Sequence, residues 1–119
     1  MKEPKIVNAK ITRTMLGRED HGIFTFMIFV EFNGSTCGIG GYSLDQAADM
    51  QGGRKYSVKG LEAIGRILDV IGVDKWEDLT GKYIRIVDDG WGSPVNEIGH
   101  IMQDKWFNLK NFFSGENER

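Results

Sequence analysis

Hydrophobic and polar residues alternate through the first third of the chain with the two-residue period of β-strands. The alternation predicts one strand over Ile6–Met15 and a second over Ile23–Phe32, joined by the polar, glycine-bounded turn Gly17–Gly22. One face of the first strand consists of alternate residues: Val7, Ala9, Ile11, Arg13 and Met15. We therefore expect an antiparallel hairpin that carries an arginine on an otherwise apolar face.

The second predicted strand differs from the first because it is apolar on both faces. One face carries Phe24, Phe26, Ile28, Val30 and Phe32, and the other carries Ile23, Met27 and Phe29. A domain of 119 residues has few elements with which to cover two apolar faces. The pattern therefore predicts that one face meets a second copy of the chain, so that the protein is at least a dimer.

The middle of the chain changes to a helical period. A glycine-rich third strand over Thr36–Tyr42 and a polar, flexible loop over Leu44–Tyr56 come first. Ser57 is a good helix N-cap, and Gly72 is the expected stop because glycine tolerates the left-handed conformation that closes a helix. The apolar stripe of this helix is predicted to consist of Leu61, Ile64, Leu68 and Ile71.

The last third predicts shorter elements. Asp74 and Glu77 have the spacing of a capping box. The elements that follow are a helical turn over Lys75–Leu79, strands over Lys82–Asp88 and Val95–Met102, a short helix over Trp106–Phe113 and a fraying tail over Ser114–Arg119. We expect one domain over residues 1–119, ordered over about 5–113. Its class is α+β, with a mostly antiparallel five-stranded sheet, one main helix and a short C-terminal helix.

Charge and composition limit the classes of partner that the chain is expected to bind. The 15 basic and 17 acidic residues give a net charge of −2, which lacks the basic surface that a binder of duplex nucleic acid needs. The most apolar run, Ile23–Phe32, is half the length of a membrane span, so no membrane partner is expected. The single cysteine, Cys37, and the absence of a signal-peptide pattern favour a reducing cytoplasm.

Candidate catalytic and metal-binding groups are sparse. Cys37 has only His21 and His100 as bases, and a small buried thiol is the simpler interpretation. His21 has no second histidine or cysteine at ligand spacing. The cluster Gly38, Gly40 and Gly41 falls short of a dinucleotide motif and leaves two interpretations open, a bulged strand or a close approach of ligand or neighbouring chain. We expect no catalytic residue, metal or cofactor.

Positive charges at positions predicted to be buried are more informative. Arg13 and Arg85 each need a partner there, either a carboxylate of the fold or a ligand phosphate. Amides, cations and an aromatic ring also gather near the C-terminus at Asn96, His100, Lys105, Trp106, Asn108, Lys110 and Asn111. These groups suit a nucleotide, which needs base stacking and hydrogen bonds to ribose and phosphate. A tail helix that buries Trp106 and leaves its lysines in solvent explains them equally well.

Four sequence strings resemble a family of small bacteriophage proteins, the first-described Thoeris anti-defence family. They are TMLGREDHGIFTF (14–26), GIGGYSLD (38–45), VDKWEDLTGKYIRI (73–86) and IGHIMQDKWFNL (98–109). The resemblance covers residues 5–113. It implies a non-catalytic sponge that sequesters a cyclic ADP-ribose isomer, or also cyclic oligonucleotides, in pockets between subunits. The protein would then act in the cytoplasm of the infected bacterial host and suppress its defence.

The resemblance also implies site residues. An asparagine in the last strand and cationic or aromatic groups near the C-terminus correspond here to Asn96, Lys105, Trp106 and Lys110. Lysines stand where arginines are expected, so Arg13, Arg54 or Arg85 would take the arginine role.

Two other functions remain open. The chain could inhibit a host protein by direct contact, through the apolar strand face or the turn at Trp91. A binder of single-stranded nucleic acid is suggested by Leu79–Ile86, but the chain lacks the basic groove that such a protein uses.

Overall fold

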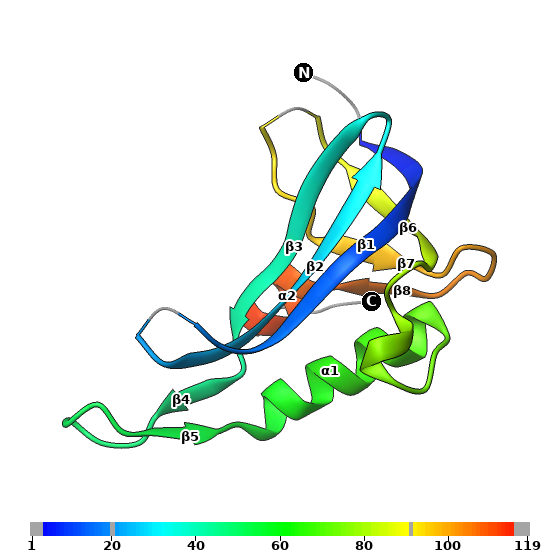
Figure 1. The fold of residues 1–119 in the computed structure, drawn as a ribbon. Coiled ribbons are helices and arrows are strands. Elements are labelled where there is room, and N and C mark those ends of the chain that lie inside the picture. The colour runs from blue at the N-terminus through cyan, green and yellow to red at the C-terminus, as the bar shows by residue number, and fades with distance from the viewer. Residues whose placement is uncertain (1–3, 20, 91, 116–119) are drawn as a thin grey trace.

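The computed structural model describes residues 4–19, 21–90 and 92–115 of the chain. Over these residues the fold is α+β, with a six-stranded antiparallel sheet of order β3-β2-β1-β6-β7-β8, a separate β4–β5 hairpin and two helices (Figure 1). The strands of the main sheet are β1 (Lys5–Glu19), β2 (Ile23–Phe32), β3 (Ser35–Ser43), β6 (Tyr83–Asp88), β7 (Glu97–Gly99) and β8 (Trp106–Asn108). The other elements are β4 (Asp45–Ala47), β5 (Arg54–Tyr56), α1 (Val58–Ile71), a 3₁₀ turn (Trp76–Asp78) and α2 (Leu109–Ser114).

The predicted antiparallel hairpin of β1 and β2 is confirmed, but the predicted face of Arg13 is wrong. The register shifts between Ile11 and Arg13, which inserts one extra residue into β1. Ile11 faces the core before this bulge, and Arg13 therefore lies on the opposite, outer face after it. Arg13 is exposed, and its guanidinium carbon lies 3.8 Å from the centroid of the Phe29 ring.

The two faces of β2 are covered by different parts of the chain. Its inner face is fully buried at Phe26, Ile28 and Val30. Its outer face is half-buried, because Met27 and Phe29 pack against their own neighbours on β1 and β3. A Cβ at Gly38 would lie 2.5 Å from Cε of Met27, so the glycine makes room for that side chain. The second strand thus obtains part of its outer cover within one chain.

The glycines of β3 form a bulged strand, which is one of the two interpretations that the sequence left open. The pairing with β2 shifts register between Thr25 and Met27. At this bulge Gly40 has φ 125° and Gly41 has φ 83°, conformations that disfavour residues with a side chain.

The predicted flexible loop over Leu44–Tyr56 is wrong, because this segment forms the β4–β5 hairpin that extends from the body (Figure 1). Asp49 orders the tip, where its Oδ1 accepts hydrogen bonds from the amides of Gln51 and Gly53, each at 2.9 Å. The local polar composition resembled a loop because the side chains of this hairpin are mostly exposed.

Both predicted ends of α1 are confirmed. The amide of Gly60 donates to Oγ of Ser57 at 2.8 Å, and Gly72 closes the helix with φ 91°. The predicted apolar stripe is confirmed in part, since Ile71 is buried and Ile64 and Leu68 pack against the core, but Leu61 is 75% exposed. The buried face consists of Gly60, Ala63, Ile67, Val70 and Ile71. Gly60 lies against the backbone of Leu44, and this close approach turns the small residues toward the sheet.

The C-terminal third differs from the prediction in three respects. No capping box forms, because Lys75 occupies the N-cap position of the 3₁₀ turn and makes no side-chain cap hydrogen bond. The strand expected over Val95–Met102 is only β7, and the helix expected over Trp106–Phe113 begins as β8. Asn108 then caps α2, accepting from the amide of Asn111 at 3.0 Å. The main sheet therefore has six strands across the described residues, not five.

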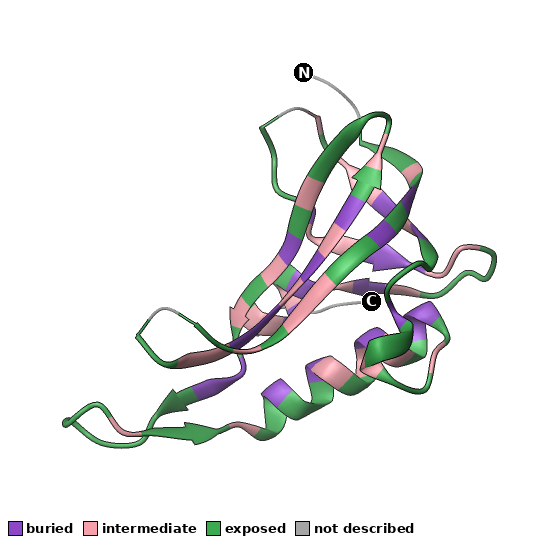
Figure 2. Cartoon of the chain, in the orientation of Figure 1, coloured by how far each residue is buried: buried purple, intermediate pink, exposed green. Residues whose placement is uncertain are grey.

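The core lies between the inner face of the sheet and α1 (Figure 2). The far edge of the sheet is tied to α2, where the rings of Tyr42 and Phe113 stack at 4.5 Å with an angle of 4° between their planes. Within the described part of the chain, no helix is long and apolar enough to cross a membrane. Of the predicted frayed tail, residues 116–119 lie outside the described residues, as does Trp91.

Candidate functional site

Four side-by-side residues on the outer face of the sheet bring together two groups that the sequence singled out. Asn8 of β1 pairs with Arg85 of β6, Arg85 pairs with Gly99 of β7, and Gly99 pairs with Trp106 of β8. Directly paired residues of antiparallel strands share a face. Their neighbours Ile86, Ile98 and Phe107 point the other way into the core. We call the row Asn8–Arg85–Gly99–Trp106 the outer row.

The indole of Trp106 lies across the backbone at Gly99. A Cβ at Gly99 would lie 2.5 Å from Cε3 of Trp106, so any larger residue would push the ring away. Nε1 of Trp106 donates to Oδ1 of Asp104 at 3.0 Å, which fixes the ring in its plane. Trp106 is half-buried, so the sheet supports the ring while part of it stays accessible. This arrangement provides an aromatic platform.

Arg85 lies over the ring of this platform and is held by neutral groups. Its guanidinium carbon is 4.8 Å from the centroid of the Trp106 ring. Its Nε donates to the carbonyl of His100 and its Nη2 to the carbonyl of Gln103, both at 2.7 Å. The sequence left a carboxylate or a ligand phosphate as partner, and the structure shows two carbonyls instead. No carboxylate contacts Arg85 in the described part of the chain, so its positive charge is not neutralised there.

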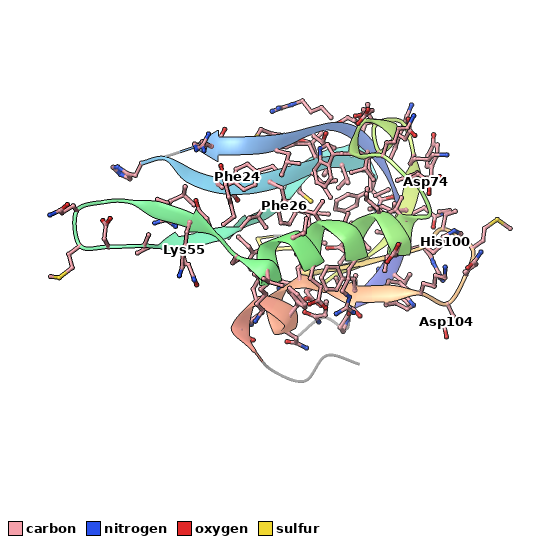
Figure 3. All side chains as sticks on the ribbon, turned by 90° about the horizontal axis from the view of Figure 1, so that it is seen from below. Phe24, Phe26, Lys55, Asp74, His100 and Asp104 are labelled. Atoms are coloured by element: carbon pink, nitrogen blue, oxygen red, sulfur yellow. The ribbon has the colours of Figure 1, made fainter. Side chains whose placement is uncertain are left out.

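The turn between β7 and β8 is organised by His100, which sequence reasoning did not assign to the site with a specific role. Nδ1 of His100 accepts hydrogen bonds from the amides of Met102 at 3.0 Å and Gln103 at 2.9 Å. The amide of His100 donates to the carbonyl of Lys105 at 3.0 Å and closes the turn. Figure 3 shows His100 and Asp104 near the C-terminal end of α1, with Lys55 near its other end. The turn therefore fixes the carbonyls that hold Arg85.

The other predicted site residues are placed apart from this row or at its margin. Lys105 precedes Trp106 and is exposed, and Lys110 is exposed on α2. Asn96 lies on the opposite side of the sheet, because it stands three residues before Gly99 and side chains alternate faces along the chain. There Oδ1 of Asn96 accepts from the hydroxyl of Tyr42 at 3.2 Å. One copy of the chain does not bring Asn96 and Trp106 to one surface.

Arg54 is neutralised within the chain. Its Nη2 lies 2.6 Å from Oδ1 of Asp45, a side chain that is almost fully buried. Asp45 also accepts from the amide of Phe24 at 3.1 Å. The hydrogen bond from Arg54 is the largest cause that lowers the pKa of Asp45 to about 2, with smaller contributions from Phe24 and Ser43. Arg54 therefore holds the base of the β4–β5 hairpin, and Arg13 lies over Phe29; neither belongs to the outer row.

Among the described residues, two of the cavities bear on the site, and their linings differ in charge. One of about 580 Å³ is lined by Cys37, Asp88 and residues of β2, β3 and the loop after β6, and the described residues of its lining include no cation and no histidine. Burial and the negative charge of Asp88 raise the pKa of the Cys37 thiol, so the thiol has little nucleophilic character. The other cavity, of about 520 Å³, is lined by Asn8, Lys82, Tyr83 and His100 among others. Only the second cavity adjoins the outer row.

The described residues contain no group of three or more histidine, cysteine, aspartate or glutamate side chains placed to hold a metal ion. The groups along the outer row and its adjoining cavity are the Trp106 ring with the Asp104 carboxylate on its Nε1, the Arg85 guanidinium, the Asn8 amide and Lys82. Apart from the carboxylate, such groups bind anions and stack on bases.

Comparison of the chain with models of known families, with curated proteins and with solved structures finds no match.

Proposed function

We propose that this protein is a non-catalytic binding protein that sequesters a cyclic nucleotide, a cyclic ADP-ribose isomer in the first instance, and thereby suppresses host antiviral defence. The observation that supports this most directly is the Trp106 ring, laid across Gly99 beside a guanidinium whose charge is not neutralised. A flat ring and a fixed cation are the two features that a base joined to phosphates requires.

The energetics favour this surface over others on the chain. A base stacked on an aromatic side chain contributes about 1–3 kcal/mol. A ligand with two phosphates is repelled by the net charge of −2, so cations must reverse the field locally. Arg85 can do this at Trp106, whereas Arg54 cannot because Asp45 neutralises it.

Asn96 would contribute from a second copy of the chain. Because Asn96 and Trp106 face opposite sides of the sheet, a ligand that touches both takes them from two subunits. This agrees with a pocket between subunits and with the proposed dimer. Light scattering should then give a mass of at least twice 13.4 kDa. A mass near 13.4 kDa at micromolar concentration would remove Asn96 from the pocket and leave a one-chain site on the outer row.

The direct test has two parts. Incubation with cyclic ADP-ribose isomers, followed by heat denaturation of the protein, should return the ligand unchanged; a cleaved product would show a hydrolase instead. In calorimetric titrations Trp106→Ala and Asn96→Ala should each weaken binding at least about tenfold, equivalent to about 1.4 kcal/mol.

The matched control is Lys55→Ala, which removes an exposed cation of β5 at the far end of α1. This variant should keep the affinity of the original chain. Melting temperatures without ligand show whether each variant is folded. Folded Trp106→Ala with full affinity would contradict the proposal.

The second candidate function is inhibition of a host protein by direct contact. The exposed apolar side chains of α1 favour it, since Val58 is 85% and Leu61 is 75% exposed. Pull-down from host lysate with Leu61→Asp as control tests it. A partner that the original chain captures and Leu61→Asp does not, together with no thermal shift from any cyclic nucleotide, would favour this function over the first.

A further inference from the structure

The two ring nitrogens of His100 have different tasks. Nδ1 accepts from two backbone amides, so it carries no proton, and the proton of the neutral ring is on Nε2. Nε2 faces the end of α1, where a Cβ at Gly72 would lie 3.2 Å from it. In the described residues Nε2 forms no hydrogen bond. The turn therefore presents an N–H donor that the fold itself does not use.

This donor borders the cavity of about 520 Å³. The polar side chains of its lining are Asn8, Lys82, Tyr83 and His100, and its walls include Ile71 and Ile101. Each of the four polar side chains can donate a hydrogen bond, and none of the described residues that line the cavity carries a carboxylate. Such a set suits a ligand group that is rich in acceptor oxygens.

Lys82 alone does not explain why this cavity suits a group rich in acceptor oxygens. It also borders a neighbouring hollow lined by Asp74, Glu77 and Asp78, whose charges oppose its attraction for an anion. Asn8 and His100 do not border that hollow, so these donors matter more than the lysine does. They are also the two residues that connect the cavity to the outer row. Asn8 pairs with Arg85, and the carbonyl of His100 accepts from Nε of Arg85.

We propose that this cavity is a phosphate subsite for the nucleotide whose base stacks on Trp106, and that His100 joins the two parts of the site. Its Nδ1 folds the turn that holds Arg85 beside the ring, and its Nε2–H donates to a phosphate oxygen. The inference rests on the proposed function, because it takes Trp106 as the base platform.

The test compares adenosine with adenosine diphosphate, measured by titration calorimetry or NMR. The original chain should bind the diphosphate at least about tenfold more tightly, as expected for hydrogen bonds to a charged group. His100→Asn supplies an acceptor in the position of Nδ1 but no donor in the position of Nε2. In this variant the affinity for adenosine diphosphate should exceed that for adenosine by no more than about twofold. The affinity for adenosine itself should change by less than about twofold.

Two further variants and the control Lys55→Ala complete the design. His100→Leu supplies neither atom and should weaken both ligands, because the turn loses its acceptor. Asn8→Ala should reduce the advantage of the diphosphate, and Lys55→Ala should leave it unchanged. If His100→Leu fails to fold, His100→Asn and Asn8→Ala still decide the result.

Equal affinity of the original chain for both ligands, no measurable binding of the diphosphate, or an undiminished advantage in His100→Asn would each overturn the subsite. So would long-range ¹H–¹⁵N spectra that place the His100 proton on Nδ1. The proposed function fails by a different measurement, namely full affinity of Trp106→Ala for the cyclic ADP-ribose isomers. If the subsite test fails but Trp106→Ala still weakens binding of the cyclic ADP-ribose isomers, only the subsite is wrong. The two proposals can therefore be told apart.

Discussion

Arg54 lies in the β4–β5 hairpin and Arg85 in β6, an inner strand of the main sheet, and the acceptors of the two arginines differ in charge. Arg54 lies 2.6 Å from the carboxylate of Asp45, which is itself nearly buried. Arg85 donates to two carbonyls at 2.7 Å, and a carbonyl carries no net charge. The first pair cancels its charge and joins the two strands of the β4–β5 hairpin, and Asp45 also ties that hairpin to β2 through the amide of Phe24. The second arginine is held as firmly but keeps its full charge for an anion.

The comparison shows how a chain of net charge −2 can present a cationic site. The number of arginines matters less than the acceptors that hold them. Carbonyl acceptors fix the guanidinium in position without neutralising it. The turn around His100 is the device that supplies these carbonyls, whereas the β4–β5 hairpin supplies a carboxylate.

The largest expected effect comes from removing Arg85. Arg85→Ala should weaken binding of the cyclic ADP-ribose isomers about 30-fold, or ~2 kcal/mol, because it deletes both the cation and a neighbour of the Trp106 ring. Arg54→Ala should leave this affinity within about twofold. Calorimetric titration of the two variants measures the contrast. Equal losses in both would show that the acceptor does not decide which arginine binds.

The next effect concerns stability and pH. A carboxylate whose pKa is lowered on folding stabilises the folded state above its unfolded value, and this contribution disappears as the pH falls through the folded value. For Asp45 the pKa falls from 3.8 to about 2, so the melting temperature should drop between about pH 4 and pH 2. Asp45→Asn should start lower and lack most of this drop, and thermal scans across that range measure both. An identical pH profile in this variant would contradict the role of Asp45.

The smallest effect in this series tests the support under the ring. Gly99→Ala places a Cβ 2.5 Å from Cε3 of Trp106 and should lift the indole from the sheet. We expect ligand binding to weaken about fivefold, or ~1 kcal/mol, because the platform is displaced rather than removed. Indole fluorescence should change in parallel. Gly17→Ala is the control, since a Cβ at Gly17 has no atom within 4 Å, and it should bind as the original chain does.

Features that depend on a few adjacent residues could be predicted from the sequence. The β1–β2 hairpin, the N-cap at Ser57 and the stop at Gly72 each follow from local chemistry, and the structure has all three. Features set by tertiary packing could not. The bulge after Ile11 moves Arg13 to the outer face, although the alternation of side chains places it inside. The close approach of Gly60 to Leu44 likewise places small residues of α1 against the sheet, and Leu61, predicted to be buried, is exposed.

The candidate site was predictable in its residue types and not in its geometry. Trp106 and Arg85 stand out as an aromatic ring and an arginine at a position predicted to be buried, but only the strand register shows that they are neighbours. β8 was missed because three residues, Trp106–Asn108, are too few to show a strand period before the helix begins. His100 was missed as an organising residue because its partners are backbone amides, which leave no trace in the side-chain pattern.

Because β1 lies between β2 and β6, its two edges are completed at different times during translation. The edge toward β2 can close within about 1–10 μs once both strands have left the ribosome. The edge toward β6 waits for the residues from Phe32 to Asp88, which at about 5–20 residues per second takes roughly 3–11 s. During those seconds the nascent chain exposes the unpaired edge of β1. The charges of Lys5 and Lys10 on this strand disfavour pairing with another chain. The speed at which the segment from Phe32 to Asp88, which includes α1, is translated therefore sets how long neighbouring nascent chains can pair with the open edge of β1.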